Sequence, residues 1–209
     1  EELEKLAKIA LANDLIIISD EIHSDFILSG NQFTSFLNVS EEILNNLLVC
    51  HAPNKTFNIA GLSAGNNIVP NPELKEIYDE TMNKYRLQGT NSLALKATEI
   101  AYTKCDQWVD ELVKVIEGNI DYFIERVEKQ LPEIRVFKPE GGYLVWMDMC
   151  PLGYSGEELD DILVNEAELF LNPGSFFKVD GDCYKRVNLA CPRYVVEDSV
   201  DRLVKTFQK

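Results

Sequence analysis

The sequence is poor in histidine and has neither a closely spaced cysteine pair nor a long apolar run. Two histidines occur among the 209 residues, and the five cysteines form no CxxC motif. A metal site would have to be assembled from scattered ligands, so we predict none. The odd cysteine count argues against a closed disulfide framework. Because we recognise neither a signal peptide nor a segment able to cross a bilayer, we predict a protein of the reducing cytoplasm.

Positive charge is also scarce. Twenty lysines and arginines face 35 aspartates and glutamates, which gives a formal net charge of −15 and a pI near 4.5. Such a surface repels phosphate backbones, so nucleic acids and anionic membranes are poor partners. Disorder is excluded by a hydrophobic fraction of 45%, which is enough to build a packed core. We therefore expect a soluble globular protein.

The first ten residues already have the pattern of a helix interior. Leu3, Leu6 and Ile9 share one face, yet neither a capping residue nor a starting methionine precedes them. We therefore expect that the sequence begins inside a longer protein.

The first 90 residues predict part of an α/β domain. A helix over 1–13 is followed by short apolar runs at 15–19, 47–50 and 67–70, which are typical of strands buried on both faces. Alternation of helices with such strands favours a mostly parallel sheet. Pro72 suits the first turn of a further helix, which should extend through Tyr85.

Residues 91–131 predict long linking helices, and residues 132–209 predict a small α+β domain. The helical pattern from Ser92 to Gln130 is too long for one ordinary helix, so we expect an interruption near residues 104–106. Alternating patterns then predict strands, and amphipathic patterns predict helices. The expected strands are 134–137, 143–148, 169–171 and 187–190, and the expected helices are 155–167 and 197–207.

Lys55 is the first candidate functional residue. It lies in HAPNKTFNIAGL, residues 51–62, just after a predicted buried strand. A loop at the carboxyl end of a parallel strand opens on the crevice where α/β folds bind ligands. Partial burial there would favour the neutral amine and make it nucleophilic toward an aldehyde. A solvated loop lysine is the ordinary alternative.

Asp20, His23 and Arg193 are the other candidates. Asp20 ends the predicted strand at 15–19, where its carboxylate can pair with a cationic ring nitrogen. His23 follows three residues later and can donate a hydrogen bond. Arg193 has the planar fork that suits bidentate capture of a carboxylate. Each residue alone has a common structural explanation: a turn aspartate, a structural histidine and a surface arginine.

Together, these residues and their surrounding segments resemble one family. The segments span nearly the whole chain, from the first predicted strand to the last predicted helix. They resemble the fold-type-I pyridoxal-phosphate (PLP) enzymes of the aminotransferase class I/II superfamily, in the cystathionine β-lyase branch often called MalY/PatB. The segments are SDEIH (19–23), NKTFNIAGL (54–62), AYTKCDQW (101–108), EGNIDY (117–122), EGGYLVWMDM (140–149), FLNPGSFF (170–177) and RVNLACPR (186–193).

The resemblance implies a fold, a cofactor and a role for each candidate. Residues 1–90 would be the C-terminal part of the PLP-binding large domain. Lys55 would bind the cofactor aldehyde covalently and later move the Cα proton, while Asp20 would pair with the ring nitrogen. His23 would lie near the ring's phenolate oxygen, and Arg193 would bind the carboxylate of an amino-acid substrate. The family also implies a homodimer.

The sequence also departs from the family. The positions just before the lysine and three before it, where many relatives have a hydroxyl residue that holds the phosphate, are Asn54 and Ala52. Ser63 stands where many aminotransferases have a phosphate-binding arginine. Family chains are nearly twice as long, and their phosphate loop, ring-stacking aromatic residue and oxygen-contacting asparagine lie upstream of Glu1. We therefore expect these 209 residues alone to bind PLP poorly.

The expected reaction is carbon–sulfur β-elimination from cystathionine or a similar cysteine conjugate, which gives a thiol, pyruvate and ammonia. An aminotransferase would use the same residues, and a non-catalytic regulatory module on the same fold is the alternative from another class. The first two differ in whether the substrate carbanion is reprotonated or expels a group from Cβ.

Overall fold

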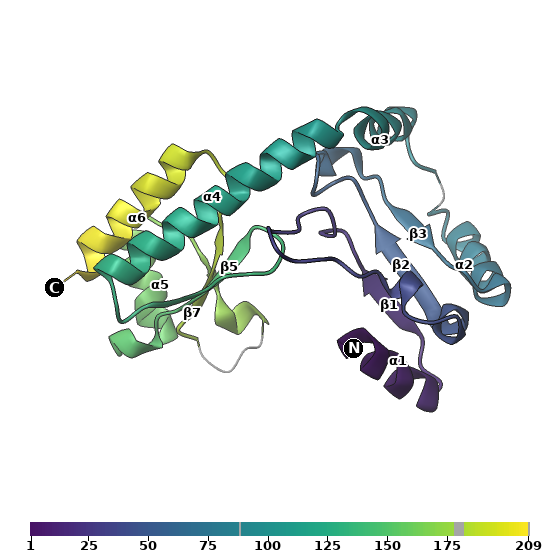
Figure 1. Ribbon diagram of the computed structural model, residues 1–209, viewed down its shortest axis with the longest axis horizontal. Coiled ribbons are helices and arrows are strands. Elements are labelled where there is room, and N and C mark those ends of the chain that lie inside the picture. Colours follow the sequence, from purple (N-terminus) through teal and green to yellow (C-terminus); the bar gives the residue numbers. More distant parts are fainter. Residues whose placement is uncertain (88, 178–181, 209) are drawn as a thin grey trace. The chain divides into compact units, whose positions relative to one another are not determined.

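The chain folds into two compact units, each with its own hydrophobic core. A computed structural model describes residues 1–87, 89–177 and 182–208 (Figure 1). The first unit comprises Glu1–Asp25 and Gln32–Val109, and the second comprises Phe26–Asn31 and Asp110–Lys209. None of the described helices is both long enough and apolar enough to cross a membrane.

The first unit contains a three-stranded sheet and three helices, and the first turn of a fourth helix. The order of its strands is β1-β2-β3. Asn71 caps α2 by accepting hydrogen bonds from the backbone N–H groups of Glu73 and Leu74, and Asn91 caps α3 in the same way. The elements are α1 (Glu2–Ala12), β1 (Ile17–Asp20), β2 (Leu47–His51), β3 (Asn66–Ile68), α2 (Pro72–Lys84), α3 (Ser92–Lys104) and the start of α4 (Asp106–Gln130).

This sheet is mixed, so the prediction of a mostly parallel sheet is wrong for this chain. Strands β1 and β2 are parallel, whereas β3 runs antiparallel to β2. The connection from β2 to β3 spans residues 52–65 and contains a short 3₁₀ turn, which ends at Ser63 in the left-handed conformation. A parallel return usually passes through a crossover helix, whereas this connection contains only the 3₁₀ turn and reverses the chain.

Only one face of β1 is covered by described residues. Ile17 and its partner Leu47 point toward α1, where they pack with Ala7 and Ala10. Ile18 points to the opposite face and is 69% exposed. The prediction that this strand is buried on both faces is therefore wrong for this chain, because α1 covers one side and no described element covers the other.

The second unit packs three helices against a four-stranded antiparallel sheet with the order β4-β5-β7-β6. Helices α4 and α6 lie side by side along it (Figure 1). Its core includes Phe123 and Val127 of α4 together with Val200 and Leu203 of α6. The elements are α4, β4 (Arg135–Phe137), β5 (Leu144–Asp148), α5 (Gly156–Asn165), β6 (Asn172–Pro173), β7 (Tyr184–Asn188) and α6 (Arg193–Phe207).

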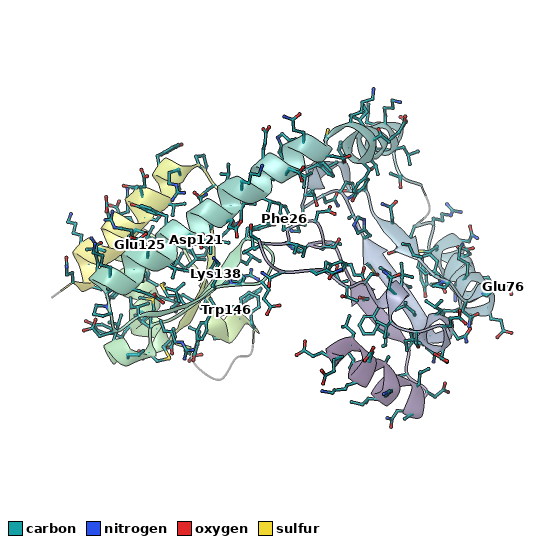
Figure 2. All side chains as sticks on the ribbon, in the orientation of Figure 1. Phe26, Glu76, Asp121, Glu125, Lys138 and Trp146 are labelled. Atoms are coloured by element: carbon teal, nitrogen blue, oxygen red, sulfur yellow. A yellow bond between two sulfur atoms is a disulfide. The ribbon has the colours of Figure 1, made fainter. Side chains whose placement is uncertain are left out.

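Two buried contacts fix the connections of this unit. The Asn119 side chain, fully buried in α4, donates hydrogen bonds to the carbonyls of Leu189 and Cys191 just after β7. Phe26, labelled in Figure 2, packs edge-on against Tyr143 and accepts a hydrogen bond from the Gly142 amide. A Cβ atom at Gly141 would lie 2.9 Å from the Phe26 carbonyl oxygen, which explains the glycine in the EGGY segment.

The predicted helix break is confirmed, and one predicted strand is wrong. Helix α3 ends at Lys104 and α4 begins at Asp106, inside the predicted interval. Residues 169–171 form no strand. Glu168 adopts a positive φ of 53°, which delays the strand, and β6 consists of Asn172 and Pro173 alone. Since proline has no N–H to donate, it limits pairing at this edge.

A disulfide joins Cys150 and Cys183, a pairing that was not predicted from the sequence. Strands β5 and β7 pair in a register whose last pair is Asp148 with Tyr184. The two cysteines lie just beyond this pair, with their Cα atoms 4.9 Å apart. The sequence spacing of 33 residues could not indicate this proximity, because it results from the strand register. Cys50, Cys105 and Cys191 are not disulfide-bonded.

A buried lysine ties α5 to β7. Lys185 is fully buried, and its Nζ lies 2.6 Å from the Asp160 carboxylate and 3.2 Å from the Asp182 carbonyl. Asp160 is 43% exposed, so water still reaches the carboxylate, whereas the ammonium has only protein partners within the described structure. Loss of the carboxylate would therefore leave a buried ammonium without a charged partner, whereas loss of the lysine would leave Asp160 in contact with water.

We expect Asp160→Ala to destabilise the protein more than Lys185→Met. Removing the carboxylate leaves a buried charge uncompensated, at a cost of about 2–4 kcal/mol, whereas an apolar side chain in place of the lysine should cost less than about 1 kcal/mol. Urea unfolding of both variants measures the difference. A larger loss for Lys185→Met would contradict this account.

Candidate functional site

The parallel pairing of β1 and β2 brings Asp20 and the Lys55 loop to one edge of the first sheet. Asp20 is the last residue of β1 and lies opposite Cys50 in the register. Strand β2 ends one residue later, at His51, and the loop with Lys55 follows directly. Burial, and then the nearby Asp20 carboxylate, raise the pKa of the Cys50 thiol, which reflects how close this carboxylate lies to β2.

A short hydrogen bond connects the two loops at this edge. The Thr56 hydroxyl donates to Asp25 Oδ2 at 2.6 Å, and Thr56 is only 1% exposed. Asp25 closes the turn at residues 22–25, which also contains the half-buried His23. Thr56 directly follows Lys55, so the contact fixes the lysine backbone relative to the segment after Asp20. The sequence analysis identified neither Asp25 nor Thr56.

The Lys55 side chain itself is exposed. The expectation of partial burial is therefore wrong for the chain as described. The loop around it is nonetheless ordered by backbone hydrogen bonds from Phe57 to Pro53 and from Ile59 to Asn54. The backbone position of the lysine is thus fixed, while its amine remains open to solvent.

Asn54 provides an unsatisfied polar group beside the lysine. Its Oδ1 atom is buried and has no hydrogen-bond partner among the described residues. Buried polar atoms are nearly always paired, so an unpaired amide oxygen directly before Lys55 suits a bound polar group. The amide can present either its oxygen or its NH₂ group, which allows it to accept from or donate to a ligand.

Glu21 organises the segment after β1, and the sequence analysis missed it. Its Oε1 accepts hydrogen bonds from the Ser19 hydroxyl, the Ser35 hydroxyl and the Phe36 amide, each at 3.0 Å. The residue is only 8% exposed. The one sequence signal that could have identified Glu21 among the acidic residues is its place directly after a strand.

A second contact holds the start of the Lys55 loop against α3. The Tyr102 hydroxyl lies 3.2 Å from Nδ1 of His51, and the Tyr102 ring meets the Phe57 ring edge-on. Burial and the Asp25 carboxylate raise the pKa of Tyr102 to about 12. The phenol therefore keeps its proton at neutral pH.

Arg193 belongs to the second unit, at the first position of α6. Its guanidinium lies over the ring of Tyr122, 4.8 Å from the ring centroid, and it is half-buried against α4 near Gly118. The contact is a cation–π interaction that also packs α6 onto α4.

Arg186 is a second arginine of this unit, and one of its N–H groups has no partner among the described residues. It lies in a cross-strand row between Trp146 of β5, labelled in Figure 2, and Asn172 of β6. Its guanidinium stacks 4.2 Å from the centroid of the Phe177 ring and donates one hydrogen bond to Asn172 Oδ1. Its Nε is buried and has no hydrogen-bond partner among the described residues.

The Arg186 environment therefore suits a carboxylate better than that of Arg193. The charge of Arg186 already acts on a neighbouring phenol: burial raises the pKa of Tyr143, and the positive guanidinium partly opposes this shift. A stacked guanidinium with an unpaired donor is prepared for bidentate binding. Arg186 is the first residue of the RVNLACPR segment, of which the sequence analysis considered only the last. The predicted strand began at residue 187, so Arg186 carried no signal of lying inside a strand, as it does in β7.

Comparison with known proteins shows the family. The sequence pattern of the aminotransferase class I and II family matches residues 1–203. The chain belongs to this family. The cystathionine β-lyase PatB of Bacillus subtilis is 34% identical over 97% of the chain. Among the relatives of this aminotransferase-family chain are thus proteins named as carbon–sulfur lyases.

Solved structures of family members agree closely with the fold. A PLP-bound protein from Clostridium difficile 630, named as an aminotransferase, is 38% identical over the whole chain, with a TM-score of 0.95. Cystalysin from Treponema denticola, whose structure contains PLP, is 35% identical over 98% of the chain, also with a TM-score of 0.95. The chain spans about half the length of these relatives: 52% of PatB, 54% of the C. difficile protein and 52% of cystalysin.

We expect Thr56→Val to loosen the Lys55 loop, because it removes the hydroxyl that donates to Asp25 and leaves a carboxylate without this partner. A hydrogen bond to a charged group contributes about 1.5–3 kcal/mol, so amide exchange over residues 51–59 should become roughly tenfold faster or more. Thr56→Ser keeps the donor and is the matched control. Hydrogen exchange read by mass spectrometry compares the two variants, and equal protection would refute a role for the hydroxyl.

Proposed function

We propose that this chain forms the lysine-bearing half of a PLP-dependent carbon–sulfur β-lyase that cleaves cystathionine or a similar cysteine conjugate. The observation that carries the proposal is the shared sheet edge of Asp20 and the Lys55 loop, joined by the hydrogen bond from Thr56 to Asp25. Carbon–sulfur lyases among the relatives support this assignment.

The residues at this edge fit the cofactor. Lys55 offers an exposed amine for the cofactor aldehyde, and Asp20 offers an exposed carboxylate for the ring nitrogen. The unpaired Asn54 amide beside them is suited to a phosphate oxygen if its NH₂ group faces the ligand, and His23 is placed in the turn after Asp20. When bound, PLP supplies an electron sink that stabilises a carbanion at the substrate Cα.

The proposed chemistry assigns a task to each side chain of the chain. With cofactor and substrate bound, the Lys55 amine would accept the Cα proton as a general base. Asp20 would place its carboxylate beside the ring nitrogen and so favour the protonated ring. The overall reaction would release the thiol from Cβ and, with one water molecule, give pyruvate and ammonia.

The substrate carboxylate requires a guanidinium, and the second unit offers two. The sequence analysis predicts Arg193 for this role. The cross-strand row and the unpaired Nε favour Arg186 instead. Arg193 has a contact of its own with the Tyr122 ring, which gives it a function in packing.

An aminotransferase is the second candidate, because the 38% identical structure from C. difficile is named as one. It would use the same lysine and the same carboxylate. The difference lies in the fate of the proton that Lys55 removes, since transamination returns it to the cofactor, whereas elimination expels a group from Cβ.

The proposal includes a further protein segment that covers the exposed face of β1. The exposed face with Ile16 and Ile18 is an apolar patch of the kind that other protein segments cover. The remainder of a family-length chain is the expected cover, and we expect the assembled enzyme to be a homodimer. Its mass in sedimentation equilibrium tests the dimer.

We expect a chimera that joins the N-terminal half of B. subtilis PatB to these 209 residues to release pyruvate from cystathionine without any keto acid. Lys55→Ala should lower the rate by at least about 10³-fold, because both the covalent attachment and the general base are lost. Lys84→Ala, at an exposed helix lysine, is the matched control. Borohydride reduction followed by peptide mapping should place the cofactor on Lys55.

The possible outcomes separate the alternatives. Bound cofactor without pyruvate would reject the lyase, and amino-group transfer to an added keto acid would then favour the aminotransferase. Cofactor trapped on another lysine would reject the role of Lys55. The 209 residues alone should show only a weak cofactor absorbance, and a band of full strength would contradict the need for further polypeptide.

We expect Arg186→Lys to raise the KM of the chimera for cystathionine at least about tenfold, because lysine keeps the charge but loses the bidentate fork. Arg193→Lys is the matched comparison and should change the KM less than about threefold. Steady-state kinetics of both variants decide between the two arginines. The reverse result would favour Arg193, as the sequence predicts.

A further inference from the structure

Three potential metal ligands meet at the end of the β5–β7 pair in the second unit. Asp148 is the last residue of β5, Cys150 follows two residues later, and Cys183 directly precedes β7. One ligand atom from each residue lies within 4.8 Å of the other two, and all three residues are half-buried. The sequence analysis predicts no metal site because the cysteines and acidic residues are scattered along the chain, and the strand register gathers these three.

The carboxylate of this cluster is held in place by groups that are not themselves ligands. The Cys150 amide donates to Asp148 Oδ1 at 3.0 Å, and the Tyr184 hydroxyl donates to Asp148 Oδ2 at 3.3 Å. Within the described part of the chain, Asp148 has no ion pair with a lysine or arginine. Carboxylates that bind metals are commonly oriented in this way by outer hydrogen bonds.

We propose that Cys150, Cys183 and Asp148 bind one Zn²⁺ ion when the disulfide is reduced. Two thiolates and one carboxylate suit Zn²⁺, which binds cysteine sulfur at about 2.3 Å and carboxylate oxygen at about 2.0–2.2 Å. Hard cations such as Mg²⁺ prefer oxygen ligands alone. A water molecule completes the tetrahedron.

The Cα separation of 4.9 Å is compatible with both states of the cysteine pair. Tetrahedral zinc thiolates lie about 3.8 Å apart at the Zn–S distance above. Rotation of the two side chains can provide this spacing without moving the strands. Disulfide and zinc thiolate exclude each other, because zinc binds the reduced and deprotonated cysteine sulfur, which the oxidised pair does not provide.

The conversion balances with a reductant of a defined class. A trialkylphosphine and water reduce the disulfide to two thiols and yield the phosphine oxide. Zn²⁺ then displaces the two thiol protons, which are released to solvent, and the total charge is conserved. In a cell, two equivalents of a small thiol would serve as reductant and leave as their disulfide.

The local charge of the site supports a cation. Asp182 lies next to Cys183 and is exposed, and the protein carries a formal net charge of −15. Both features raise the local concentration of divalent cations. The site uses none of the residues proposed for the lyase reaction, so the proposal does not rest on that function.

The test titrates the phosphine-reduced 209-residue chain with Zn²⁺ in the variant C50S/C105S/C191S, which keeps only the cysteine pair. We expect about one equivalent of bound metal by elemental analysis, a raised thermal midpoint, and, with Co²⁺ as a probe, a thiolate-to-metal charge-transfer band. The oxidised protein should bind no metal. Zinc-free reduced protein should regain the disulfide with oxidised glutathione, whereas zinc-loaded protein should resist.

Matched variants identify the ligands. Cys150→Ser should abolish the charge-transfer band. Asp148→Asn should lower the affinity for Zn²⁺ by more than the roughly 10–100-fold that loss of an outer hydrogen-bond partner typically costs. Tyr184→Phe, which removes only an outer donor, should have the smaller effect. Circular dichroism checks that each variant is folded. No uptake on reduction, equal uptake by the oxidised protein, or unchanged affinity in Asp148→Asn would each overturn the proposal.

Discussion

The parallel pairing of β1 with β2 is the interaction on which the rest of the first unit depends. It places Asp20 opposite Cys50, so that the two strands end at the same edge of the sheet. Everything proposed for the cofactor follows from this register, because a shift by one residue would turn Asp20 toward the face covered by α1. Glu21 and the Thr56–Asp25 hydrogen bond then fix the loops that leave this edge.

Much of the fold could be predicted because its helices and their boundaries follow from local sequence patterns. The break between α3 and α4 at Cys105 follows from the length of the helical pattern, and Pro72 marks the start of α2. The mixed sheet could not be predicted in the same way. Its antiparallel strand β3 depends on a loop that turns at Ser63, and residue periodicity carries no information about strand direction.

The residues of the candidate site likewise differ in whether the sequence could predict them. Asp20 ends β1 and Lys55 lies in the loop that follows β2, so sequence order alone indicated the edge at which they lie. Arg186 was missed because its distinguishing features, the partners Trp146 and Asn172, come from other strands and appear only once β5, β6 and β7 are paired. The pairing of Cys150 with Cys183 was hidden for the same reason.

The free edge of β1 has a consequence for how these 209 residues behave by themselves in solution. Among described residues this strand pairs only with β2, and its other side offers backbone donors and acceptors next to apolar side chains. An unpaired strand edge of this kind accepts any extended chain, including a second copy of itself. Correct folding of these 209 residues is thus in kinetic competition with self-association, and the balance shifts toward aggregation as their concentration rises.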